Sequence, residues 1–372
     1  MSPHSETLKN GLRVVYVPCE AESVAFGLFI SSGSRYEEAR VAGISHFIEH
    51  MLFKGTPMRR PIDITRAIEG RGGNFNAFTG EEATCYYAHL PDEYLNEAVE
   101  ILGDMYLNAS MPDDEFAREK QVVIEEIRMY ADEPDAVAME NLQRSLFPCN
   151  PVGAPVAGSA ASLSPLKPTD LKRYVRSHYL PQNTVVVIAG HFDESAAHDV
   201  LVRTFGRFRA GRHTVPAIVP VDFSVPPVAE VSVTKDVNQA QLALGYRSFG
   251  IHDPRKYAAT VMDAILGRGM SSRLFQEVRE KRGLSYDISS RMQFFEDAGM
   301  FTVSAGLDRT KTAKALSTID RELMRIRTKR VSAAELNRVK EFLIGNFKLS
   351  HEKVTSKLFF YGATMSSFGR LV

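Results

Sequence analysis

The sequence is poor in cysteine, has no net charge and contains no long apolar run. Its three cysteines, Cys19, Cys85 and Cys149, are odd in number and far apart, which excludes a disulfide framework or a zinc knuckle and indicates free thiols in a reducing compartment. Lysine and arginine together number 45, as do aspartate and glutamate, so no basic surface for nucleic acid or a membrane is expected. No run reaches the roughly 18 apolar residues of a membrane span, and the N-terminus has no apolar signal region. We therefore expect a soluble, cytoplasmic protein.

The remaining composition is that of an ordinary globular protein. The 372 residues are 44% hydrophobic and 24% charged, and this length allows two or three domains. Between residues 208 and 228 the helical periodicity is lost, and glycine and proline interrupt the chain repeatedly. We place a linker there and predict an N-terminal domain over residues 1–215 and a C-terminal domain over residues 216–372.

Strand-like and helix-like patterns occur in both predicted domains. After a hairpin turn at Asn10 and Gly11, the predicted strands are residues 12–17, 23–31, 72–79, 84–90, 183–190, 230–237, 240–246, 285–295 and 299–305. The predicted helices cover residues 44–54, 61–70, 91–108, 112–130, 256–266, 271–281 and 353–371, with further helices before residue 178.

One short segment of the first domain carries a pattern typical of metal binding. Residues 43–56 contain His46-x-x-Glu49-His50 within an apolar helical pattern. Positions four apart lie on one face of a helix, so His46 and His50 can direct their imidazoles at one ion, and imidazole nitrogen suits zinc. Glu49 can reach the edge of the same site, close enough to take a proton from a metal-bound water. The order His-x-x-Glu-His is the inverse of the His-Glu-x-x-His of other zinc hydrolases.

The alternative for such histidines is an ordinary core or surface position without a ligand. The surrounding sequence favours a metal. Ser45 is expected to cap the helix, which should end at Lys54 and Gly55. The neighbouring residues are mostly apolar, so two histidines and a glutamate would be costly to bury there unless they are paired or bind an ion.

The C-terminal domain resembles a diverged copy of the N-terminal domain. Aligning Gly55 with Gly269 places Thr260 opposite His46, Asp263 opposite Glu49 and Ala264 opposite His50. The copy keeps the apolar positions and loses both histidines. The same helix can therefore be built without them, which argues against a purely structural role for the histidine pair.

The third protein ligand of a catalytic zinc should come from another element. On the predicted helix 112–130, Glu119 and Glu126 are seven apart and lie together on the flank of the apolar face, whereas Glu125 points toward solvent. Periodicity therefore favours Glu119 or Glu126 over Glu125 and leaves the choice between the first two open. The alternative is that all three are solvated, as glutamates on helix flanks commonly are.

Together these residues resemble the inverzincin zinc peptidases, the family of the mitochondrial processing peptidases, pitrilysin and insulysin, and especially its short bacterial processing-peptidase branch. The resemblance covers nearly the whole chain. In that family the pattern continues as Arg-Glu-x-x-x-x-x-x-Glu, which Arg118, Glu119 and Glu126 match. The resemblance implies that Glu126 is the third zinc ligand and that Glu119 is a supporting acid.

A second family pattern, Arg-x-x-x-x-x-x-Tyr before a strand, is matched by Arg279 and Tyr286. The resemblance implies that these two side chains close over the substrate and stabilise the scissile carbonyl. Without it, they would be interpreted as a solvated arginine and a packed tyrosine.

The resemblance also implies a mode of substrate binding. Residues 74–79 are similar to the family's edge strand, which pairs with an extended peptide, so Asn74, Asn76, Ala77 and Phe78 are the expected substrate contacts. The alternative is an ordinary edge strand blunted by the two glutamates that follow it. The implied fold is α+β, with two homologous halves, each a mainly antiparallel β-sheet with helices packed on one face. Short family members pair as dimers that enclose a chamber.

The sequence therefore predicts a zinc metalloendopeptidase that holds one Zn²⁺ per chain through His46, His50 and Glu126, with Glu49 as the base. Its partners would be a peptide substrate and a second copy of itself, because one chain carries the complete set of catalytic residues. The alternatives are a non-catalytic or heteromeric subunit of a processing-peptidase-like complex, and a peptide-binding module with a structural zinc. Family chains usually continue beyond the last predicted helix, so the resemblance leaves open a short member or a truncated C-terminus.

Overall fold

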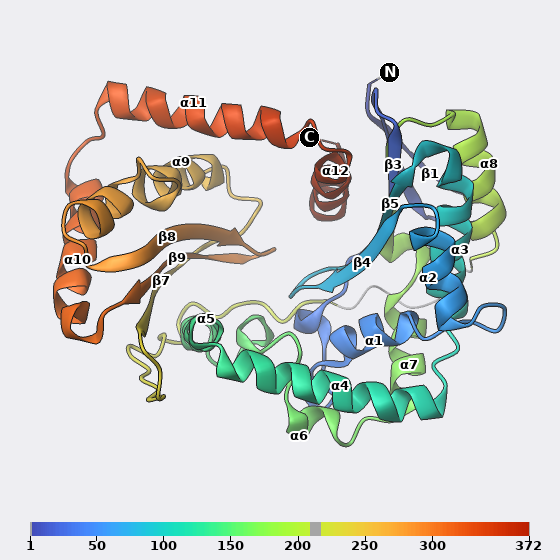
Figure 1. Cartoon of the computed structure of the whole chain (residues 1–372), viewed down its shortest axis with the longest axis horizontal. Coiled ribbons are helices and arrows are strands. Elements are labelled where there is room, and N and C mark those ends of the chain that lie inside the picture. Colours follow the sequence, from blue (N-terminus) through green and yellow to red (C-terminus); the bar gives the residue numbers. More distant parts are fainter. Residues whose placement is uncertain (1, 209–216, 372) are drawn as a thin grey trace. The chain divides into compact units, whose positions relative to one another are not determined.

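The structure, a computed structural model, describes residues 2–208 and 217–371 (Figure 1). Its tertiary contacts form two compact units. Unit 1 comprises Met1–Ile127, Pro155–Val219 and Ser350–Val372, and unit 2 comprises Arg128–Ala154 and Pro220–Leu349. Each unit contains one β-sheet and several helices, which confirms the predicted α+β class with two sheet-and-helix halves.

The sheet of unit 1 has six strands in the order β1-β2-β6-β3-β5-β4. Their bounds are β1 His4–Thr7, β2 Arg13–Pro18, β3 Ser23–Ile30, β4 Asn74–Thr79, β5 Thr84–Pro91 and β6 Thr184–Gly190. Neighbouring strands are antiparallel except for β2 and β6, which are parallel. The predicted hairpin joins β1 to β2, and Gly11 there has a φ of +91°, a left-handed conformation that glycine adopts without strain. Strand β4 forms one edge of the sheet.

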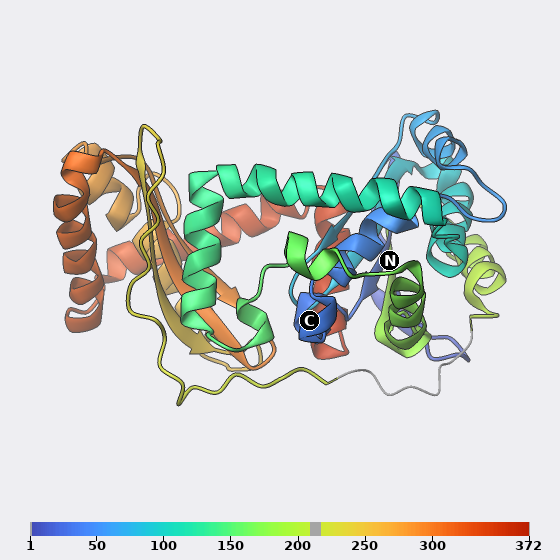
Figure 2. The ribbon, with the colours of Figure 1, turned by 90° about the horizontal axis from the view of Figure 1, so that it is seen from below.

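Helices cover both faces of this sheet, so the prediction that they would pack on one face is wrong in this respect. They are α1 Ile44–Leu52, α2 Pro61–Glu69, α3 Leu95–Asn108, α4 Asp113–Asp132, α6 Ala160–Leu163, α7 Pro168–His178, α8 Glu194–Phe205 and α12 Val354–Phe368. Because side chains alternate along a strand, Val14 and Tyr16 join the main core with α1, α3 and α8, whereas Val15 and Val17 belong to a second cluster with Leu358 of α12. Helix α4 runs alongside α1 in both views of the ribbon (Figures 1 and 2).

Unit 2 is built around three antiparallel strands in the order β7-β9-β8. Its elements are α5 Pro134–Leu146, β7 Ala240–Phe249, α9 Lys256–Gly267, a π-helical turn Phe275–Glu280, β8 Ser285–Phe294, β9 Ala298–Leu307, α10 Thr312–Thr328 and α11 Ala333–Ser350. Side chains also alternate along β9, so the two faces of this sheet pack against different helices. Phe301 and Val303 of β9 pack with α9 and α10, and Met300 packs with α5.

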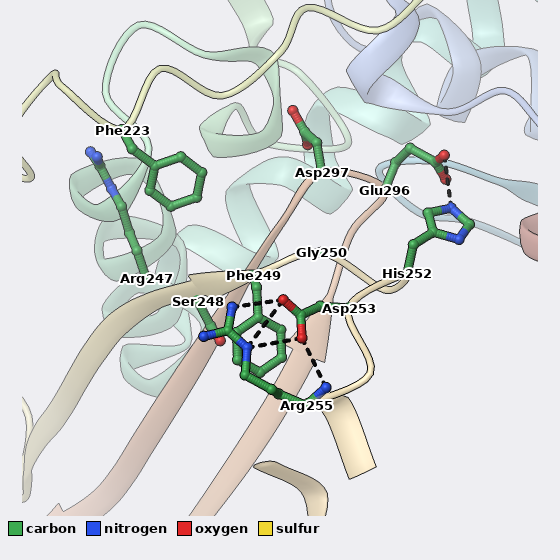
Figure 3. A pocket seen from close by; sticks show the side chains of 10 residues that line it. All are labelled: Phe223, Arg247, Ser248, Phe249, Gly250, His252, Asp253, Arg255, Glu296 and Asp297. Atoms are coloured by element: carbon green, nitrogen blue, oxygen red, sulfur yellow. Dashed lines mark hydrogen bonds and ion pairs between the residues drawn. The ribbon is translucent and has the colours of Figure 1, made fainter. Parts of the chain in front are cut away.

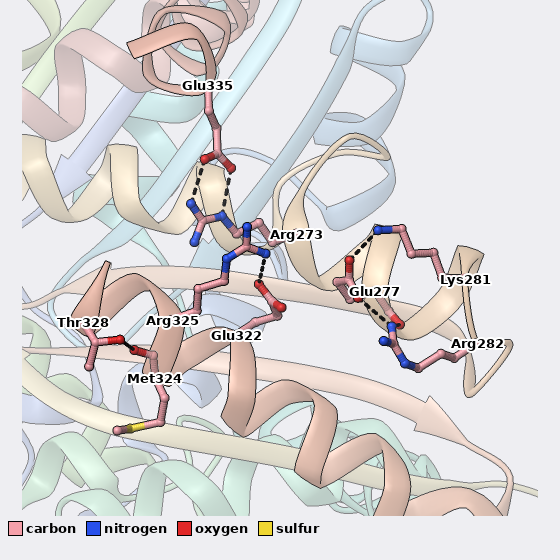
Figure 4. A network of polar contacts seen from close by, with 9 residues as sticks. All are labelled: Arg273, Glu277, Lys281, Arg282, Glu322, Met324, Arg325, Thr328 and Glu335. Atoms are coloured by element: carbon pink, nitrogen blue, oxygen red, sulfur yellow. Dashed lines mark hydrogen bonds and ion pairs between the residues drawn. The ribbon is translucent and has the colours of Figure 1, made fainter. Parts of the chain in front are cut away.

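Ion pairs join the helices of unit 2 (Figure 4). Arg273, with a side chain that is 10% exposed, makes two hydrogen bonds of 2.8 and 2.7 Å to the carboxylate of Glu335 on α11. Glu277 accepts hydrogen bonds of 2.6 Å from both Lys281 and Arg282, which closes the turn after the π-helix. The geometry of the Arg273 pair is bidentate, the arrangement that adds most to specificity. These contacts order the segment that carries Arg279.

Each unit includes one helix that comes from the opposite half of the sequence. Helix α5 lies in the first half of the sequence but packs on β7 in unit 2, and α12 lies in the second half but packs on β3 and β6 in unit 1. The compact units therefore differ from the linear halves 1–215 and 216–372. An amphipathic helix pattern shows that a face must be buried, but it does not show which sheet buries it.

One predicted strand is wrong. Residues 230–237 contain no strand and are largely exposed, although their sequence is rich in valine. Within the described residues, β7 pairs with β9 alone, and residues 230–237 find no strand partner for their backbone groups. Of the predicted linker, residues 209–216 lie outside the described residues, and residues 217–228 form neither helix nor strand. Across the described chain, none of the helices combines the length and the apolar character that a membrane span would need.

Candidate metal centre

The helix that carries the His-x-x-Glu-His motif begins at a glycine and is capped from outside. Gly43 has a φ of +92°, and a Cβ placed there would lie 2.5 Å from the carbonyl oxygen of Ala157. The carboxylate of Glu37 accepts hydrogen bonds from the backbone N–H groups of Gly43 (2.6 Å) and Ser45 (2.7 Å). Ser45 was expected to be the cap, and this prediction is wrong, because Ser45 is the second residue of the helix and its hydroxyl contacts Tyr174 (3.0 Å). Burial raises the pKa of Glu37 to about 7, although its backbone hydrogen bonds oppose the rise.

The structure brings the three predicted ligands together. His46 and His50 lie one turn apart on α1, with ring centroids 4.7 Å apart. Glu126 reaches them from α4, with its Oε2 3.3 Å from His50 Nε2 and its Oε1 3.8 Å from His46 Nε2. One ligand atom from each residue lies within 4.8 Å of the others. Within the described residues, this is the cluster of histidine and acidic side chains that is close enough to hold an ion.

The residues present fit a zinc ion. Two imidazole nitrogens and one carboxylate oxygen form the donor set of a catalytic zinc, which leaves a coordination position for water. Burial, together with a smaller effect of the neighbouring His50, lowers the pKa of His46 to about 4, so His46 is neutral at ordinary pH, as a ligand must be. Its Nδ1 is buried and has no hydrogen-bond partner among the described residues. Burial without a polar partner disfavours the charged imidazolium, in agreement with a neutral ring.

A second carboxylate orients His50. His50 Nδ1 lies 3.0 Å from Oε1 of Glu119, and Lys54 Nζ lies 2.6 Å from Oε2 of the same carboxylate. With Nδ1–H donating to Glu119, the lone pair of Nε2 faces Glu126. Burial opposes ionisation of Glu119, but the hydrogen bonds from His50 and Lys54 lower its pKa overall. Burial also opposes the charged form of His50, yet Glu119, Glu126 and Glu49 together raise its pKa.

Glu49 lies beside this cluster and outside the ligand set. Burial raises its pKa, although the hydroxyl of Thr79 donates a hydrogen bond of 2.5 Å to Glu49 Oε2 and opposes that rise. A carboxylate with a raised pKa is a stronger base than an exposed glutamate, and this one lies next to two imidazoles. Glu49 therefore lies on the same helix as His46 and His50 but outside the cluster that they form with Glu126.

Strand β4 lies at the edge of the sheet, as predicted for the substrate strand. Its side chains alternate, so Asn74, Asn76 and Phe78 are exposed, whereas Ala77 packs against the main core on the other side. The ring of Phe78 contacts Phe359 of α12, with centroids 5.9 Å apart. The four predicted substrate residues therefore do not share one face, and what they have in common is the backbone of an edge strand.

The two predicted residues of the second half lie together in unit 2. The guanidinium of Arg279 lies 5.3 Å from the centroid of the Tyr286 ring, and the tyrosine is 77% exposed. The tyrosine is therefore not packed, in contrast to the interpretation expected without the resemblance. Asp263, which corresponds to Glu49 in the repeat, is fully buried and bonds to Arg268 and Ser290. The action of Arg279 and Tyr286 on a substrate stays a prediction.

A separate pocket of unit 2, about 460 Å³ in volume, has a different character (Figure 3). Arg255 stacks on Phe249 at 4.5 Å and forms an ion pair of 2.7 Å with Asp253, and His252 lies 2.9 Å from Glu296. Arg255 and Asp253 pair within one loop and His252 and Glu296 pair between two loops, and both contacts stabilise the loops that line the pocket.

Sequence reasoning missed three residues that support the site. Lys54 lies four residues after His50, and this spacing alone could have indicated that it shares a helix face with the histidine. Thr79 follows Phe75 and Ala77 in the alternation of β4, which could have placed it on the side of α1. For Glu37 there is no local signal, because it precedes the helix by several residues and reaches the helix terminus only through the turn between them.

A helix bearing His-x-x-Glu-His, a glutamate delivered by a second long helix, and two sheet-and-helix halves define the class of two-domain zinc peptidases. A family model described as "Insulinase (Peptidase family M16)" matches residues 13–160, and one described as "Peptidase M16 inactive domain" matches residues 165–343. The chain belongs to peptidase family M16, and the predicted resemblance is confirmed.

Relatives and solved structures agree with this assignment. The chain is 35% identical over 354 residues to the uncharacterized zinc protease YmxG of Bacillus subtilis, covering 95% of this chain and 85% of that one. It is 35% identical over 373 residues to the uncharacterized zinc protease Rv2782c of Mycobacterium tuberculosis, covering 100% of this chain and 85% of that one. A protease from Helicobacter pylori shares the fold with a TM-score of 0.90 at 23% identity, covering 98% of this chain and 90% of that one. The names of the sequence relatives imply zinc, in agreement with the donor set found on α1 and α4.

Proposed function

We propose that this protein is a zinc-dependent metalloendopeptidase with one zinc ion per chain. The observation that supports the proposal is the convergence of His46, His50 and Glu126 on one point, with Glu49 beside them and outside the ligand set. A structural zinc would need a fourth protein ligand, and among the described residues this cluster has three. The alternative of a peptide-binding module with a structural zinc is therefore disfavoured.

The residues take distinct roles. When bound, zinc would lower the pKa of a water molecule and polarise the carbonyl of the peptide. Glu49 accepts the proton of the attacking water and then donates it to the leaving amine. Glu119 holds His50 in the tautomer that presents Nε2 to the metal. In the same proposal, Arg279 and Tyr286 stabilise the negative charge that develops on the carbonyl oxygen.

The substrate is an extended or unfolded peptide that adds to the edge of β4. Main-chain hydrogen bonds to an edge strand provide affinity largely without regard to sequence, and the alternating side chains of Asn74, Asn76, Ala77 and Phe78 modulate selectivity. The proposal includes an enclosed chamber, which would exclude folded proteins. It also includes a homodimer in the cytoplasm, with no nucleic-acid or membrane partner.

The alternative is a non-catalytic or heteromeric subunit of a processing-peptidase-like complex. One matching family model is described as an inactive domain, but it begins at residue 165, after all of the zinc-site residues. The chain retains every proposed ligand and the base, so nothing in the N-terminal half requires a second, different subunit for chemistry.

The Glu49→Gln variant tests the proposal. Glutamine keeps the shape of the side chain but cannot take a proton, so zinc content should stay at one per chain while turnover of a quenched peptide library falls by about 10²- to 10⁴-fold. Glu69→Gln, at an exposed glutamate of α2, is the matched control and should keep both properties. Full turnover by Glu49→Gln would remove the mechanism. Zinc-loaded wild-type protein that cleaves no peptide until a different chain is added would favour the heteromeric alternative.

A further inference from the structure

The contact between Thr79 and Glu49 joins the edge strand to the catalytic helix. Thr79 is the last residue of β4, and Glu49 lies in the last turn of α1, which ends at Leu52. The Thr79 hydroxyl donates a hydrogen bond of 2.5 Å to Glu49 Oε2. Within the described parts of the chain this is the hydrogen bond that Glu49 receives, so the position of the carboxylate depends on this one hydroxyl.

Strand pairing aims the hydroxyl at α1. Alternation along β4 places Phe75 and Ala77 against the main core, and Thr79 continues the same row of side chains. Thr79 pairs with Thr84 of β5 at the last position of the strand ladder, so its backbone is fixed on one side by the sheet. The direction of its side chain therefore follows from the register of β4.

The turn after β4 is fixed as well. Gly80 N–H donates to the carbonyl oxygen of Ala83 at 2.8 Å, and the carbonyl oxygen of Gly80 accepts from the N–H of Ser34 at 3.2 Å. Arg35, which is 1% exposed, forms an ion pair with Glu82 in the same turn and donates its backbone N–H to the carbonyl of Glu81 at 2.8 Å. Breaking such a buried ion pair would leave an uncompensated charge, so Arg35 holds the turn in place.

The backbone of Gly33 also packs closely against the turn after β4. A Cβ at Gly33 would lie 2.2 Å from the carbonyl oxygen of Gly80, so only glycine allows the two loops to meet. The backbone of Thr79 is therefore fixed on one side by the sheet and on the other by the turn. A residue that positions another side chain needs such a preorganised backbone.

We propose that Thr79 is a positioning residue that determines which oxygen of Glu49 acts as the base. The inference rests on the proposed peptidase function. A carboxylate oxygen that accepts a short hydrogen bond has one of its two lone pairs occupied and becomes less basic, which favours Oε1 as the oxygen that accepts the proton of the water. The same bond prevents rotation of Glu49 away from the site, which keeps the base at the distance that proton transfer requires.

This assignment also links substrate binding to chemistry. A peptide that adds to the edge of β4 contacts the strand whose last residue orients the base. The substrate strand and the base are therefore positioned by one continuous backbone segment, and their relative placement does not depend on a flexible loop.

Three variants at Thr79 test the proposal. Thr79→Val keeps the shape and removes the hydroxyl, so kcat should fall by about 10- to 100-fold, the range that a hydrogen bond to a charged group provides, while KM and zinc content stay within twofold of wild type. Thr79→Ser restores the hydroxyl and should return kcat to within about threefold of wild type. Thr79→Ala also removes the hydroxyl and replaces the valine variant if that variant does not fold.

Thr84→Val is the matched control. It removes the hydroxyl of the cross-strand partner, which donates to the carbonyl of Ser32 and does not touch Glu49, so it should lower thermal stability and leave kcat unchanged. Crystal structures of the zinc-free variants test the same role independently of metal binding and activity, because they show the conformers of the Glu49 side chain. Glu49 should occupy one conformer in wild type and Thr79→Ser, and more than one in Thr79→Val.

The outcomes separate this proposal from the proposed function. If wild type with zinc cleaves no peptide, the peptidase function fails, and the zinc-free conformers of Glu49 still decide the role of Thr79. If wild type is active and Thr79→Val retains its kcat, or Thr79→Ser loses as much as Thr79→Val, the positioning role is overturned.

Discussion

The contact between Glu119 and His50 can be tested by its effect on zinc affinity. Glu119 is 7% exposed, accepts a hydrogen bond from His50 Nδ1 at 3.0 Å and pairs with Lys54 at 2.6 Å. Glu119→Gln keeps an oxygen that can accept from His50 but loses the negative charge. Glu119→Ala loses the acceptor as well, and leaves the ammonium group of Lys54 without this carboxylate.

The expected magnitude follows from these two contacts. Loss of a partner that orients a metal-binding histidine weakens metal affinity by about 10- to 100-fold, and each tenfold corresponds to about 1.4 kcal/mol. Because glutamine retains a neutral hydrogen bond, we expect about tenfold weaker zinc binding for Glu119→Gln. For Glu119→Ala, which loses a charge-assisted hydrogen bond entirely, we expect about 100-fold weaker binding, or close to 3 kcal/mol.

Competition of the zinc-free protein with a chelator of known affinity measures this effect. Glu125→Gln is the matched control, since Glu125 lies on the same helix and is exposed. Circular dichroism of each zinc-free variant establishes that the fold is retained. If folded Glu119→Ala bound zinc within twofold of wild type, Glu119 would not orient His50 and the reasoning would be wrong.

Three further predictions concern the ligand set, the helix cap and the assembly. Glu126→Gln should lower zinc occupancy far more than Glu125→Gln, and equal occupancy by metal analysis would mean that another residue is the third ligand. The folded state raises the pKa of Glu37 to about 7 from an ordinary 4.5, so it binds the proton more tightly than the unfolded state does, and the free energy of unfolding should fall by about 3 kcal/mol as pH rises from 4.5 to 7. Chemical denaturation across that range should show a flatter profile for Glu37→Gln, and identical slopes in the two proteins would contradict the assignment. Light scattering across a dilution series should show a homodimer, and a monomer that is fully active at every concentration would disprove it.

The motif on α1 shows which part of the candidate site can be predicted from local sequence. The spacing of His46, Glu49 and His50 is a property of one helix, and the helix geometry is the same wherever it forms. The seven-residue spacing of Glu119 and Glu126 on α4 is local in the same sense, and both residues do reach the site, one at each imidazole nitrogen of His50. Periodicity could not rank them, because both lie on the flank that faces α1.

Sequence determined the class of elements, the edge-strand pattern of β4 and the residues of the His-x-x-Glu-His helix, because these depend on contacts between near neighbours in the chain. Only the tertiary structure decided that Glu37 and not Ser45 caps α1, that α5 and α12 each cover the sheet of the other half, and that residues 230–237 do not form a strand. A cap from a distant loop, the choice of sheet by an amphipathic helix and the pairing of a strand all depend on which segments meet in space. Local patterns establish what each segment can form, and long-range packing selects its partner.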